Sequence, residues 1–486
     1  MNELRQSDLS TARLLHEVAG YAAAFLESLE DRRVDAVAGR EELLRRLGGE
    51  LPERPTEAAG VIHELIAAAE DGIVASGAGR FFGFVIGGSL PAALGADWLT
   101  TTWDQNAGLF LTSPSASVVE DVAAHWIKQL LGLPAGASVG FVTGCQMASF
   151  TCLAAARHHV LAQVGWDVES QGLARCPRLR VLAGRQRHVT IDRALRFLGL
   201  GTDLLELIDV DSQGRMLPGP LRQALRGSSV PTVVCAQAGE VNTGAMDPLV
   251  EICDIAHDAG CWVHVDGAFG LWAAASPRLR HLLAGVDRAD SWATDCHKWL
   301  NVPYDSGLAI CAHPASHRAA MTAHASYLTR ADTEQPGDEV DWVPDFSRRA
   351  RGFAVYAALR SLGRSGVAGV VERSCDRASS LAQRLADDPA VEILNDVELN
   401  QVLFRLRGDD RNARTAALPQ LVRNDGVCWL SGTSWEDRPA VRVSVTSWRT
   451  TEADVARSAE SILRAARGKS TGAEHTGAEP LEGSPD

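Results

Sequence analysis

Residues 291–303 read SWATDCHKWLNVP and place Lys298 between a histidine and a tryptophan, at the end of an apolar run. A lysine that is removed from water in such a run has a lowered pKa, because burial disfavours its charged form. Its neutral amine can then attack an aldehyde and form a Schiff base. Since most lysines are exposed, these letters alone are more often those of a surface residue at a helix end.

A second segment, residues 261–270 (CWVHVDGAFG), reads as a buried strand that ends at Asp266 and continues into small residues. Open α/β sheets bind their ligands at the carboxyl ends of the strands, so Asp266 is a site candidate. It precedes Lys298 by roughly 30 residues, about the length of one strand-to-strand unit. A carboxylate at this edge can pair with the ring nitrogen of pyridoxal phosphate and keep it protonated, which lets the ring accept electrons.

Together, HVDGAFG and TDCHKWLNVPYDSG resemble the group II pyridoxal-phosphate-dependent decarboxylases, the family of aromatic amino acid, glutamate and diaminobutyrate decarboxylases. The likeness runs from about Arg80 to Thr451, with the motifs in the family's order. It implies an α/β protein with the fold-type I PLP-dependent transferase fold. In this plan a large domain with a mostly parallel seven-stranded sheet is joined to a smaller C-terminal α+β domain, and a helical arm precedes both.

The resemblance and the local patterns together predict four parts of the chain. Residues 1–105 are expected to form a helical arm and dimerisation segment, and residues 106–362 the large cofactor-binding domain. Residues 363–468 are expected to form the small α+β domain, and residues 469–486, which are small, polar and acidic, a disordered tail. In the family the arm wraps the partner subunit, so the resemblance also implies a homodimer.

The bulk composition is that of an ordinary globular protein, with 486 residues of which 46% are apolar and 22% charged. The chain has no apolar run of membrane-spanning length and does not begin like a signal peptide, so we expect a cytoplasmic protein with no membrane partner. Ten scattered cysteines without metal-like spacing predict reduced, buried thiols and no metal site. The net charge of −14 argues against a nucleic-acid partner.

Residues 140–152 (GFVTGCQMASFTC) predict a strand that leads through Gly144 into a helix. Backbone N–H groups at the start of a helix attract phosphate, although one glycine is weak support for such a site. The family binds the cofactor phosphate at this turn, and the resemblance therefore assigns Gly144, Cys145 and Gln146 to it.

The resemblance also assigns His297 to the phosphate and Ala268 to the cofactor. Asp295 stands where relatives often have an asparagine near the phosphate. A carboxylate there repels a phosphate dianion unless it points away or is protonated, so His297 is the better phosphate ligand.

His188 is followed by a short predicted helix that closes with Leu198 and Gly199. A lone histidine is usually an ordinary core or surface residue. The family has a histidine in this position, and the resemblance implies that the ring of His188 stacks on the cofactor and contacts the substrate carboxylate.

Asp247 precedes Pro248 at the start of a predicted helix, where a carboxylate can accept the first free N–H groups. The resemblance adds a polar contact beneath the cofactor ring. Many relatives have two threonines where this chain has Glu240 and Val241, which removes a hydroxyl beside the cofactor's phenolic oxygen. Asn242 or Thr243 are the open alternatives for that contact.

Residues 80–91 (RFFGFVIGGSLP) resemble the family's substrate-side segment, so Phe84, Val85 and Ile86 are expected to line the substrate pocket. The alternative, an ordinary core at a glycine-rich turn, is equally open. Gln105 and Asn106 lie where relatives offer residues to the neighbouring active site. The apolar residues favour an apolar or aromatic substrate and the amides a polar one, so the amino acid stays open.

Arg442 lies inside the apolar strand AVRVSVT, where an unpaired guanidinium is costly. It therefore needs an anionic partner, either a substrate carboxylate or a structural one. Tyr327, roughly 30 residues after Lys298 in a polar segment that reads as a mobile loop, matches the family's tyrosine that protonates the substrate α-carbon.

The resemblance implies a PLP-dependent decarboxylase of amino acid metabolism, a lyase that converts an L-amino acid into its amine and CO2 through a Schiff base on Lys298. Catalysis would then rest on Lys298, Asp266, His188 and Tyr327. Alternatives are a decarboxylation-dependent oxidative deaminase or aldehyde synthase, a fold-type I aminotransferase, and a catalytically inactive cofactor-binding protein.

Overall fold

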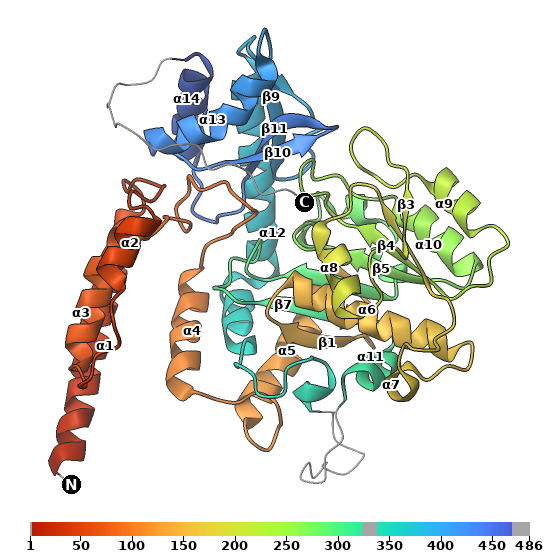
Figure 1. Ribbon diagram of the computed structural model, residues 1–486, viewed down its shortest axis with the longest axis horizontal. Helices are drawn as coiled ribbons and strands as arrows, with labels where there is room; N and C mark the ends of the chain where they lie inside the picture. Colours follow the sequence, from red (N-terminus) through yellow and green to blue (C-terminus); the bar gives the residue numbers. More distant parts are fainter. Residues whose placement is uncertain (1, 323–337, 469–486) are drawn as a thin grey trace.

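The computed structural model describes residues 2–322 and 338–468, and Figure 1 shows a helical arm, a large α/β unit and a smaller unit of sheet and helices. This architecture confirms the fold class expected from the sequence. The domain boundaries at residues 105, 362 and 468 remain predictions. None of the described helices combines the length and the apolar character that a bilayer crossing needs.

The large unit is built on a seven-stranded sheet in the order β1-β7-β6-β5-β4-β2-β3. Its strands are β1 (Ser138–Val142), β2 (Arg180–Gly184), β3 (Leu205–Ile208), β4 (Thr232–Gln237), β5 (Trp262–Asp266), β6 (Ser291–Asp295) and β7 (Gly307–Cys311). Only β7 runs against the others, pairing antiparallel with β1 and β6, while β3, β2, β4, β5 and β6 pair in parallel. The carboxyl ends of β1, β4, β5 and β6 therefore meet at one edge of the sheet.

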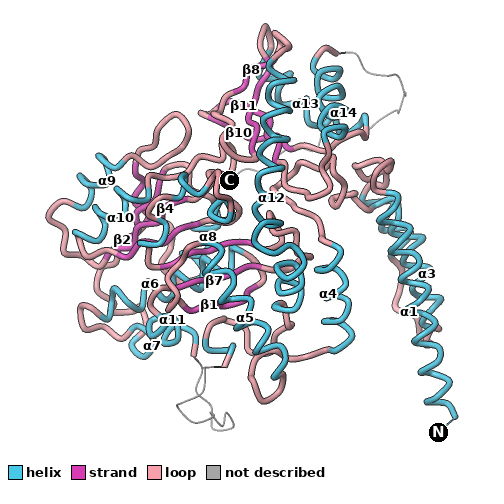
Figure 2. Tube along the Cα trace, turned by 180° about the vertical axis from the view of Figure 1, so that it is seen from behind, coloured by secondary structure: helices cyan, strands magenta, loops and turns pink. Residues whose placement is uncertain are grey.

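Helices cover both faces of this sheet (Figures 1 and 2). They include α5 (Pro114–Leu131), α6 (Cys145–Ala162), α8 (Val189–Phe197), α9 (Pro218–Leu225), α10 (Leu249–Asp258) and α11 (Pro314–Met321), while the short α7 (Val168–Gln171) follows α6 and α4 (Pro91–Trp103) packs along the long helix 352–386. Every residue of β5, β6 and β7 is buried, as expected for strands that are covered on both faces.

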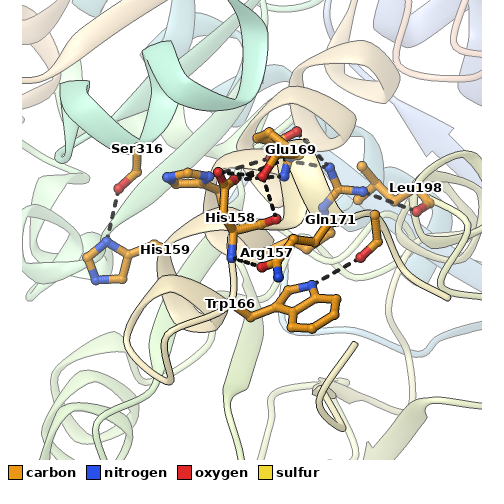
Figure 3. A network of polar contacts seen from close by, with 11 residues as sticks. Arg157, His158, His159, Trp166, Glu169, Gln171, Leu198 and Ser316 are labelled. Atoms are coloured by element: carbon orange, nitrogen blue, oxygen red, sulfur yellow. Dashed lines mark hydrogen bonds and ion pairs between the residues drawn. The ribbon is translucent and has the colours of Figure 1, made fainter. Parts of the chain in front are cut away.

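Helix α6 lies across one face, and a network of polar contacts fixes its carboxyl-terminal half (Figure 3). Arg157 donates from Nη1 to the Leu198 carbonyl at 3.3 Å, and the Nδ1 of His159 lies 3.0 Å from Ser316 Oγ. Trp166 donates to the carbonyl of Gly172 at 3.0 Å, which closes the α6–α7 connection. Because α6 is fixed in this way, its first turn is fixed at the carboxyl edge of the sheet.

The smaller unit has an antiparallel four-stranded sheet in the order β10-β11-β9-β8. Its strands are β8 (Val391–Ile393), β9 (Gln401–Leu406), β10 (Ser431–Trp435) and β11 (Arg438–Ser444), and its helices are α13 (Arg411–Asp425) and α14 (Glu452–Ala466). Apolar residues from these strands and helices form a core of their own. The small unit thus packs independently of the large sheet.

A long helix, α12 (Gly352–Ala386), connects the two units (Figure 2). Its backbone is non-helical at Gly363, with φ 60° and ψ −180°, so two helices meet there across a kink. Such a positive φ is accessible to glycine without steric cost, and this explains why the kink falls at that residue.

The arm consists of α1 (Asn2–Ser28), α2 (Arg40–Leu47) and α3 (Ala58–Ala69), and it stands away from both units in both views (Figures 1 and 2). No residue of α2 or α3 is buried. Side chains of α1 and α3 line a groove between the two helices, with Leu14, Val18, Ile62 and Ile66 among them. The arm therefore has little core of its own.

Candidate functional site

Three functional side chains come from neighbouring strand ends at the carboxyl edge of the large sheet. Asp266 is the last residue of β5 and Asp295 the last residue of β6, and both are buried. Lys298 follows three residues after β6 ends. The sheet register pairs Asp266 with Ala293, so the two acidic strand ends lie side by side beside the first turn of α6.

Lys298 is paired with Asp295 in this structure. Its Nζ lies 3.1 Å from Asp295 Oδ2, and the other carboxylate oxygen, Oδ1, accepts the backbone N–H of Cys145 at 2.6 Å. The Nε2 of His297 lies 3.4 Å from the same Oδ1. Asp295 thus connects the lysine with the amino-terminal turn of α6.

The pKa of Lys298 is raised above its ordinary value. Burial acts to lower it, but the negative charges of Asp295 and, further away, Asp266 act more strongly in the opposite direction. The lowered pKa expected from the apolar sequence context is therefore wrong, because a carboxylate is buried together with the amine.

The chain has only three lysines, Lys128, Lys298 and Lys469. Lys128 donates from Nζ to the carbonyls of Ala135 and Ala137, at 2.8 and 2.7 Å, beyond the end of α5. Lys469 lies outside the described residues. Among the described residues, Lys298 is therefore the only lysine at the carboxyl edge of the sheet.

Asp266 is held by short contacts from two directions. Its Oδ1 accepts the backbone N–H of Ala268 at 3.2 Å and the thiol of Cys145 at 3.4 Å. Burial, followed by the charge of Asp266, raises the pKa of the Cys145 thiol well above its usual value, so the thiol stays protonated and donates. The contacts orient the carboxylate toward the space between β5 and α6.

His188 precedes α8 and is half-buried, with Nδ1 2.8 Å from Thr190 Oγ1. Burial lowers its pKa; Asp266 acts in the opposite direction, whereas Lys298 and Arg442 add to the effect. The charges of Asp266, Lys298 and Arg442 act on the ring, and Gln146 in the first turn of α6 donates to the carbonyl of Thr190, two residues after His188. His188 therefore lies near Asp266 and Lys298 at the same edge of the sheet.

Gly144 lies between the end of β1 and the start of α6, as the sequence predicted, and the phosphate contact of this turn stays a prediction. A Cβ on Gly144 would lie 3.0 Å from His297 Cε1 and 3.3 Å from Asp295 Oδ1, so this position has no room for a side chain. Gln146 uses its side chain to donate to the Thr190 carbonyl at 3.3 Å. Its backbone N–H, in contrast, belongs to the first turn of α6, where a helix supplies no internal acceptor.

Asp247 does not cap α10, contrary to the sequence-based prediction. Helix α10 begins after Pro248 without a side-chain cap, and the buried carboxylate of Asp247 instead accepts the N–H groups of Met216 and Gln237, both at 2.7 Å. Burial raises its pKa to about 6 despite these hydrogen bonds. Its role toward the cofactor stays a prediction.

Glu240 stands where many relatives have a threonine, and its side chain bonds to the backbone of its own turn. Its buried carboxylate accepts the N–H groups of Asn242 and Thr243 at 2.7 Å each, and burial raises its pKa. Glu240 therefore stabilises the turn between β4 and α10.

Arg442 is buried on β11, and its Nη1 lies 3.4 Å from Asn242 Oδ1, while its Nε has no hydrogen-bond partner among the described residues. Burial lowers its pKa, and only Glu240 opposes this shift. Within the described chain it forms no direct ion pair, but the buried carboxylate of Glu240 is close enough for its charge to act on the guanidinium, so the structural and the substrate carboxylate both stay open as partners.

The substrate-side segment passes directly against the backbone of Lys298. A Cβ on Gly87 would lie 1.9 Å from the Lys298 carbonyl oxygen, so only glycine fits at this approach. Val85 is fully buried in the main core, which is the ordinary-core alternative, and Ile86 is half-buried. Phe84 is 62% exposed, and its ring centroid lies 5.5 Å from that of Trp429.

Asn106, predicted to contact the substrate, is exposed, and its Oδ1 accepts the backbone N–H of Arg348 at 3.1 Å. Tyr327 lies outside the described residues.

Tyr304 lies within the TDCHKWLNVPYDSG motif but was not among the site residues predicted from the sequence. The ring centroids of Tyr304 and His297 are 4.3 Å apart. The motif itself was the signal that could have identified it.

The residues present fit pyridoxal phosphate. Lys298 could supply a primary amine for the aldehyde, Asp266 a fixed carboxylate for the ring nitrogen, and His297 with the α6 amides contacts to the phosphate. Asp295 is the one residue whose charge opposes the phosphate. No group of three or more His, Cys, Asp or Glu side chains in the described parts of the chain is arranged to hold a metal ion.

Comparison with known proteins agrees with this chemistry. A family model described as the pyridoxal-dependent decarboxylase conserved domain matches residues 41–407. An aromatic-L-amino-acid decarboxylase of Bacillus atrophaeus is 26% identical over 88% of this chain and 89% of its own length. A phenylacetaldehyde synthase of Petunia hybrida is 25% identical over 80% of this chain and 79% of its own length.

The fold also matches solved structures over nearly the whole chain. A crystal structure of Oryza sativa TDC with PLP and tryptamine superposes with a TM-score of 0.89 and 23% identity, covering 95% of this chain and 98% of that one. At this identity the likeness establishes the fold alone, which agrees with the large sheet and small unit described above.

Proposed function

The chain belongs to the pyridoxal-dependent decarboxylase family, and from this membership we propose that it converts an L-amino acid into the corresponding amine and CO2 with Lys298 as the cofactor-binding lysine. The protein is a PLP-dependent amino acid decarboxylase, a carboxy-lyase. The observation that supports the proposal most directly is that Lys298, Asp266 and His188 all lie at the carboxyl edge of the large sheet.

Each of these side chains has a distinct task in the proposed reaction. Bound pyridoxal phosphate supplies the ring that accepts the electrons of the broken carbon–carboxylate bond. Lys298 would hold the cofactor covalently, and Asp266, fixed by Ala268 and Cys145, would keep a proton on the ring nitrogen. His188, whose pKa is lowered by burial, would contact the cofactor ring and the substrate carboxylate and so help to orient the reacting bond.

Arg442 is the proposed partner of the substrate carboxylate. Its guanidinium is buried, lacks an ion pair in the described chain, and has an Nε without a hydrogen-bond partner there. A buried guanidinium in this state is costly, and a bound carboxylate removes that cost. The charge of Arg442 also acts on His188, which supports a common substrate contact for both.

The nature of the product depends on which acid protonates the substrate α-carbon after CO2 has left. We assign this step to Tyr327, which makes the amine the expected product. The alternative is an aldehyde synthase, and a specific observation favours keeping it: relatives of this chain include a phenylacetaldehyde synthase of Petunia hybrida and a 4-hydroxyphenylacetaldehyde synthase of Rhodiola rosea.

We further propose a homodimer in the cytoplasm. Helices α2 and α3 bury no residue, and large apolar side chains are exposed along the arm and on α4, among them Leu15, Leu65, Trp98 and Trp103. An arm with so little core gains stability by covering a partner subunit. Ten free thiols, of which only Cys176 is not fully buried, agree with a reducing compartment.

The test is a substrate screen with matched lysine variants. Purified protein with added cofactor is given each proteinogenic amino acid, diaminobutyrate and ornithine, and CO2, amine, aldehyde and ammonia are measured. Aromatic amino acids are tried first because Phe84 and Trp429 form an aromatic pair beside the Lys298 segment. Lys298→Ala should lose the cofactor absorption band and slow turnover by several orders of magnitude, whereas Lys128→Ala should retain both.

Borohydride reduction followed by peptide mapping identifies the attached lysine. Only three lysines exist, so the result is unambiguous. Cofactor on Lys128 or Lys469 would end the proposal. A keto acid product without CO2 release would indicate an aminotransferase instead.

A further inference from the structure

Asp295 binds two donors at once, the Lys298 ammonium and a backbone amide of α6, one with each carboxylate oxygen. Oδ2 lies 3.1 Å from Lys298 Nζ, and Oδ1 accepts the first N–H of α6, that of Cys145, at 2.6 Å. The side chain is fully buried, and its backbone is fixed by hydrogen bonds from Asp295 N–H to the Ala268 carbonyl and from Trp272 to the Asp295 carbonyl, both at 2.9 Å. This carboxylate therefore cannot leave the site without breaking both contacts or moving the strand end.

We propose that Asp295 is an internal anion that competes with the cofactor phosphate for the first turn of α6 and keeps Lys298 protonated, so that it limits how tightly and at which pH the cofactor is loaded. The inference rests on the proposed role of Lys298. It makes Asp295 a positioning residue, which acts through the lysine and the helix start and not on the substrate.

The competition follows from charge. Backbone N–H groups at a helix start favour an anion, and in this protein the carboxylate already uses one of them. A phosphate that approaches the remaining amides of Gln146 and Met147 meets the negative charge of Asp295 at short range. Asp266, the acidic end of the neighbouring strand, adds a second negative charge on the same side.

The second effect concerns the amine. The bond to the cofactor forms between Nζ and the aldehyde carbon with loss of water, and it requires the unprotonated amine. The proton on Nζ must therefore pass to solvent before attack, and a carboxylate at 3.1 Å opposes this loss. Asp295 thus shifts covalent loading of the cofactor toward higher pH.

The groups that face Asp295 come from each element packed against it. His297 Nε2 lies 3.4 Å from Oδ1, Lys298 pairs with Oδ2, and Cys145 of α6 lies against Asp266 of β5. His188 and Tyr304 are also close enough for the charge of Asp295 to act on them; burial lowers the pKa of His188 and raises that of Tyr304, so both side chains are neutral near pH 8. Burial lowers the pKa of His297, so this ring is largely neutral and does not cancel the carboxylate charge near pH 8. Lys298 is therefore the main counter-ion of Asp295.

The test compares Asp295→Asn with Asp305→Asn in full-length protein from which the cofactor has been removed. The first variant removes the charge and keeps the shape. The second removes an aspartate from the loop after β6, whose side chain is 42% exposed and pairs with Arg351 at 2.7 Å. Binding of pyridoxal phosphate is measured by absorbance and by tryptophan fluorescence between pH 6 and 10.

Asp295→Asn should bind pyridoxal phosphate at least about tenfold more tightly at pH 8, and the pH midpoint of the loading rate should fall by about one unit, since tenfold corresponds to one pKa unit. Asp305→Asn should match the parent in both. Unchanged or weaker binding by Asp295→Asn, or an identical change in both variants, would overturn the inference.

A second measurement uses pyridoxal, which has the aldehyde but no phosphate. If Asp295 competes with the phosphate, the preference for pyridoxal phosphate over pyridoxal should widen in Asp295→Asn relative to the parent. An unchanged preference contradicts the competition. If Asp295→Asn fails to fold, Asp295→Glu, which keeps the charge, is measured in its place. It should show the same preference for pyridoxal phosphate over pyridoxal as the parent. A wider preference in Asp295→Glu counts against the inference.

Peptide mapping after borohydride reduction separates the two levels of the argument. Cofactor trapped on a lysine other than Lys298 refutes the proposed function itself. Cofactor trapped on Lys298 with unchanged affinity in Asp295→Asn refutes only the role of Asp295.

Discussion

The thiol of Cys145 donates a hydrogen bond to Asp266 across 3.4 Å, joining the first residue of α6 to the last residue of β5. The two residues are 121 positions apart in the chain. One carboxylate oxygen of Asp266 is thereby fixed by the thiol and by the Ala268 N–H. This arrangement fixes the carboxylate of Asp266, which could then accept a hydrogen bond from a protonated ring nitrogen and keep it protonated.

Asp266→Asn should retain the fold and bind the cofactor but lower kcat by about 10²-fold or more, as expected when one preorganised electrostatic partner is lost. An amide cannot keep the ring nitrogen protonated, and each pKa unit lost there corresponds to about 1.4 kcal/mol of differential stabilisation. Steady-state kinetics and the absorbance of the bound cofactor check this. An Asp266→Asn enzyme with parental kcat would show that this carboxylate is not the ring partner.

Cys145 should resist alkylation, because burial and then the charge of Asp266 raise the pKa of its thiol above the ordinary value. Since the pKa is raised, the thiolate is scarce at pH 8 and becomes available only at much higher pH. Iodoacetamide labelling followed by mass spectrometry measures this, with the partly exposed Cys176 as the internal reference that should react first. Cys145 labelling ahead of Cys176 at pH 8 would contradict the buried hydrogen-bonded thiol.

The positions of Asp266 and Gly144 in the fold could be predicted because strand ends and helix starts have local signals. Asp266 ends an apolar strand and Gly144 precedes a helix, so both could be placed at one sheet edge before any coordinates. Side-chain partners do not have such signals. The pairing of Lys298 with Asp295 reversed the expected pKa shift, since spacing does not reveal which way a carboxylate points.

The hydrogen-bond partners of Asp247 likewise could not be predicted from its local sequence. An aspartate before a proline at a helix start is typical of a cap, and the backbone N–H groups of Met216 and Gln237 compete successfully for it because they would otherwise be buried without acceptors. These donors come from other segments of the chain. A local sequence pattern cannot predict hydrogen-bond donors from distant segments. The family resemblance rests on a whole segment, and it could therefore predict a role for His188.

Asp247→Ala should destabilise the protein, with roughly 1–3 kcal/mol lost for each amide left unsatisfied. Both affected N–H groups are buried beside β4, so the loss should appear in the free energy of unfolding measured by denaturant titration. Thr433→Ala provides a control, since its side chain contacts Asn242 on a neighbouring turn and leaves no buried backbone amide unpaired. Equal effects of the two substitutions would contradict the assigned role.

The pH dependence of stability should also change in Asp247→Asn. The folded carboxyl has a pKa of about 6, above its ordinary 3.8, so the folded state binds more protons between these values. Its contribution to stability is therefore present at low pH and is lost as the pH rises from about 4 to about 6. The difference in unfolding free energy between parent and Asp247→Asn should vary across this window and be flat above pH 7.

Tyr327→Phe should shift the product from amine toward aldehyde. The chain has four tyrosines: Tyr21 bonds to Glu70 at 2.6 Å on the arm, and Tyr356 stacks on Trp126, which leaves Tyr304 and Tyr327 as candidates for the acid that protonates the α-carbon. Removing only the hydroxyl of Tyr327 leaves cofactor binding intact, because no acid is needed for it. The electron-rich α-carbon then persists after CO2 has left and reacts with oxygen.

Tyr304→Phe is the matched control, since Tyr304 lies beside His297 and loses the same hydroxyl. With Tyr327 as the acid, Tyr327→Phe should consume oxygen and release aldehyde and ammonia, whereas Tyr304→Phe should continue to form amine. Product analysis and an oxygen electrode distinguish the two. If Tyr304→Phe instead forms aldehyde and Tyr327→Phe forms amine at the parental rate, Tyr304 is the proton donor, and if neither variant changes the product, His188 becomes the next candidate.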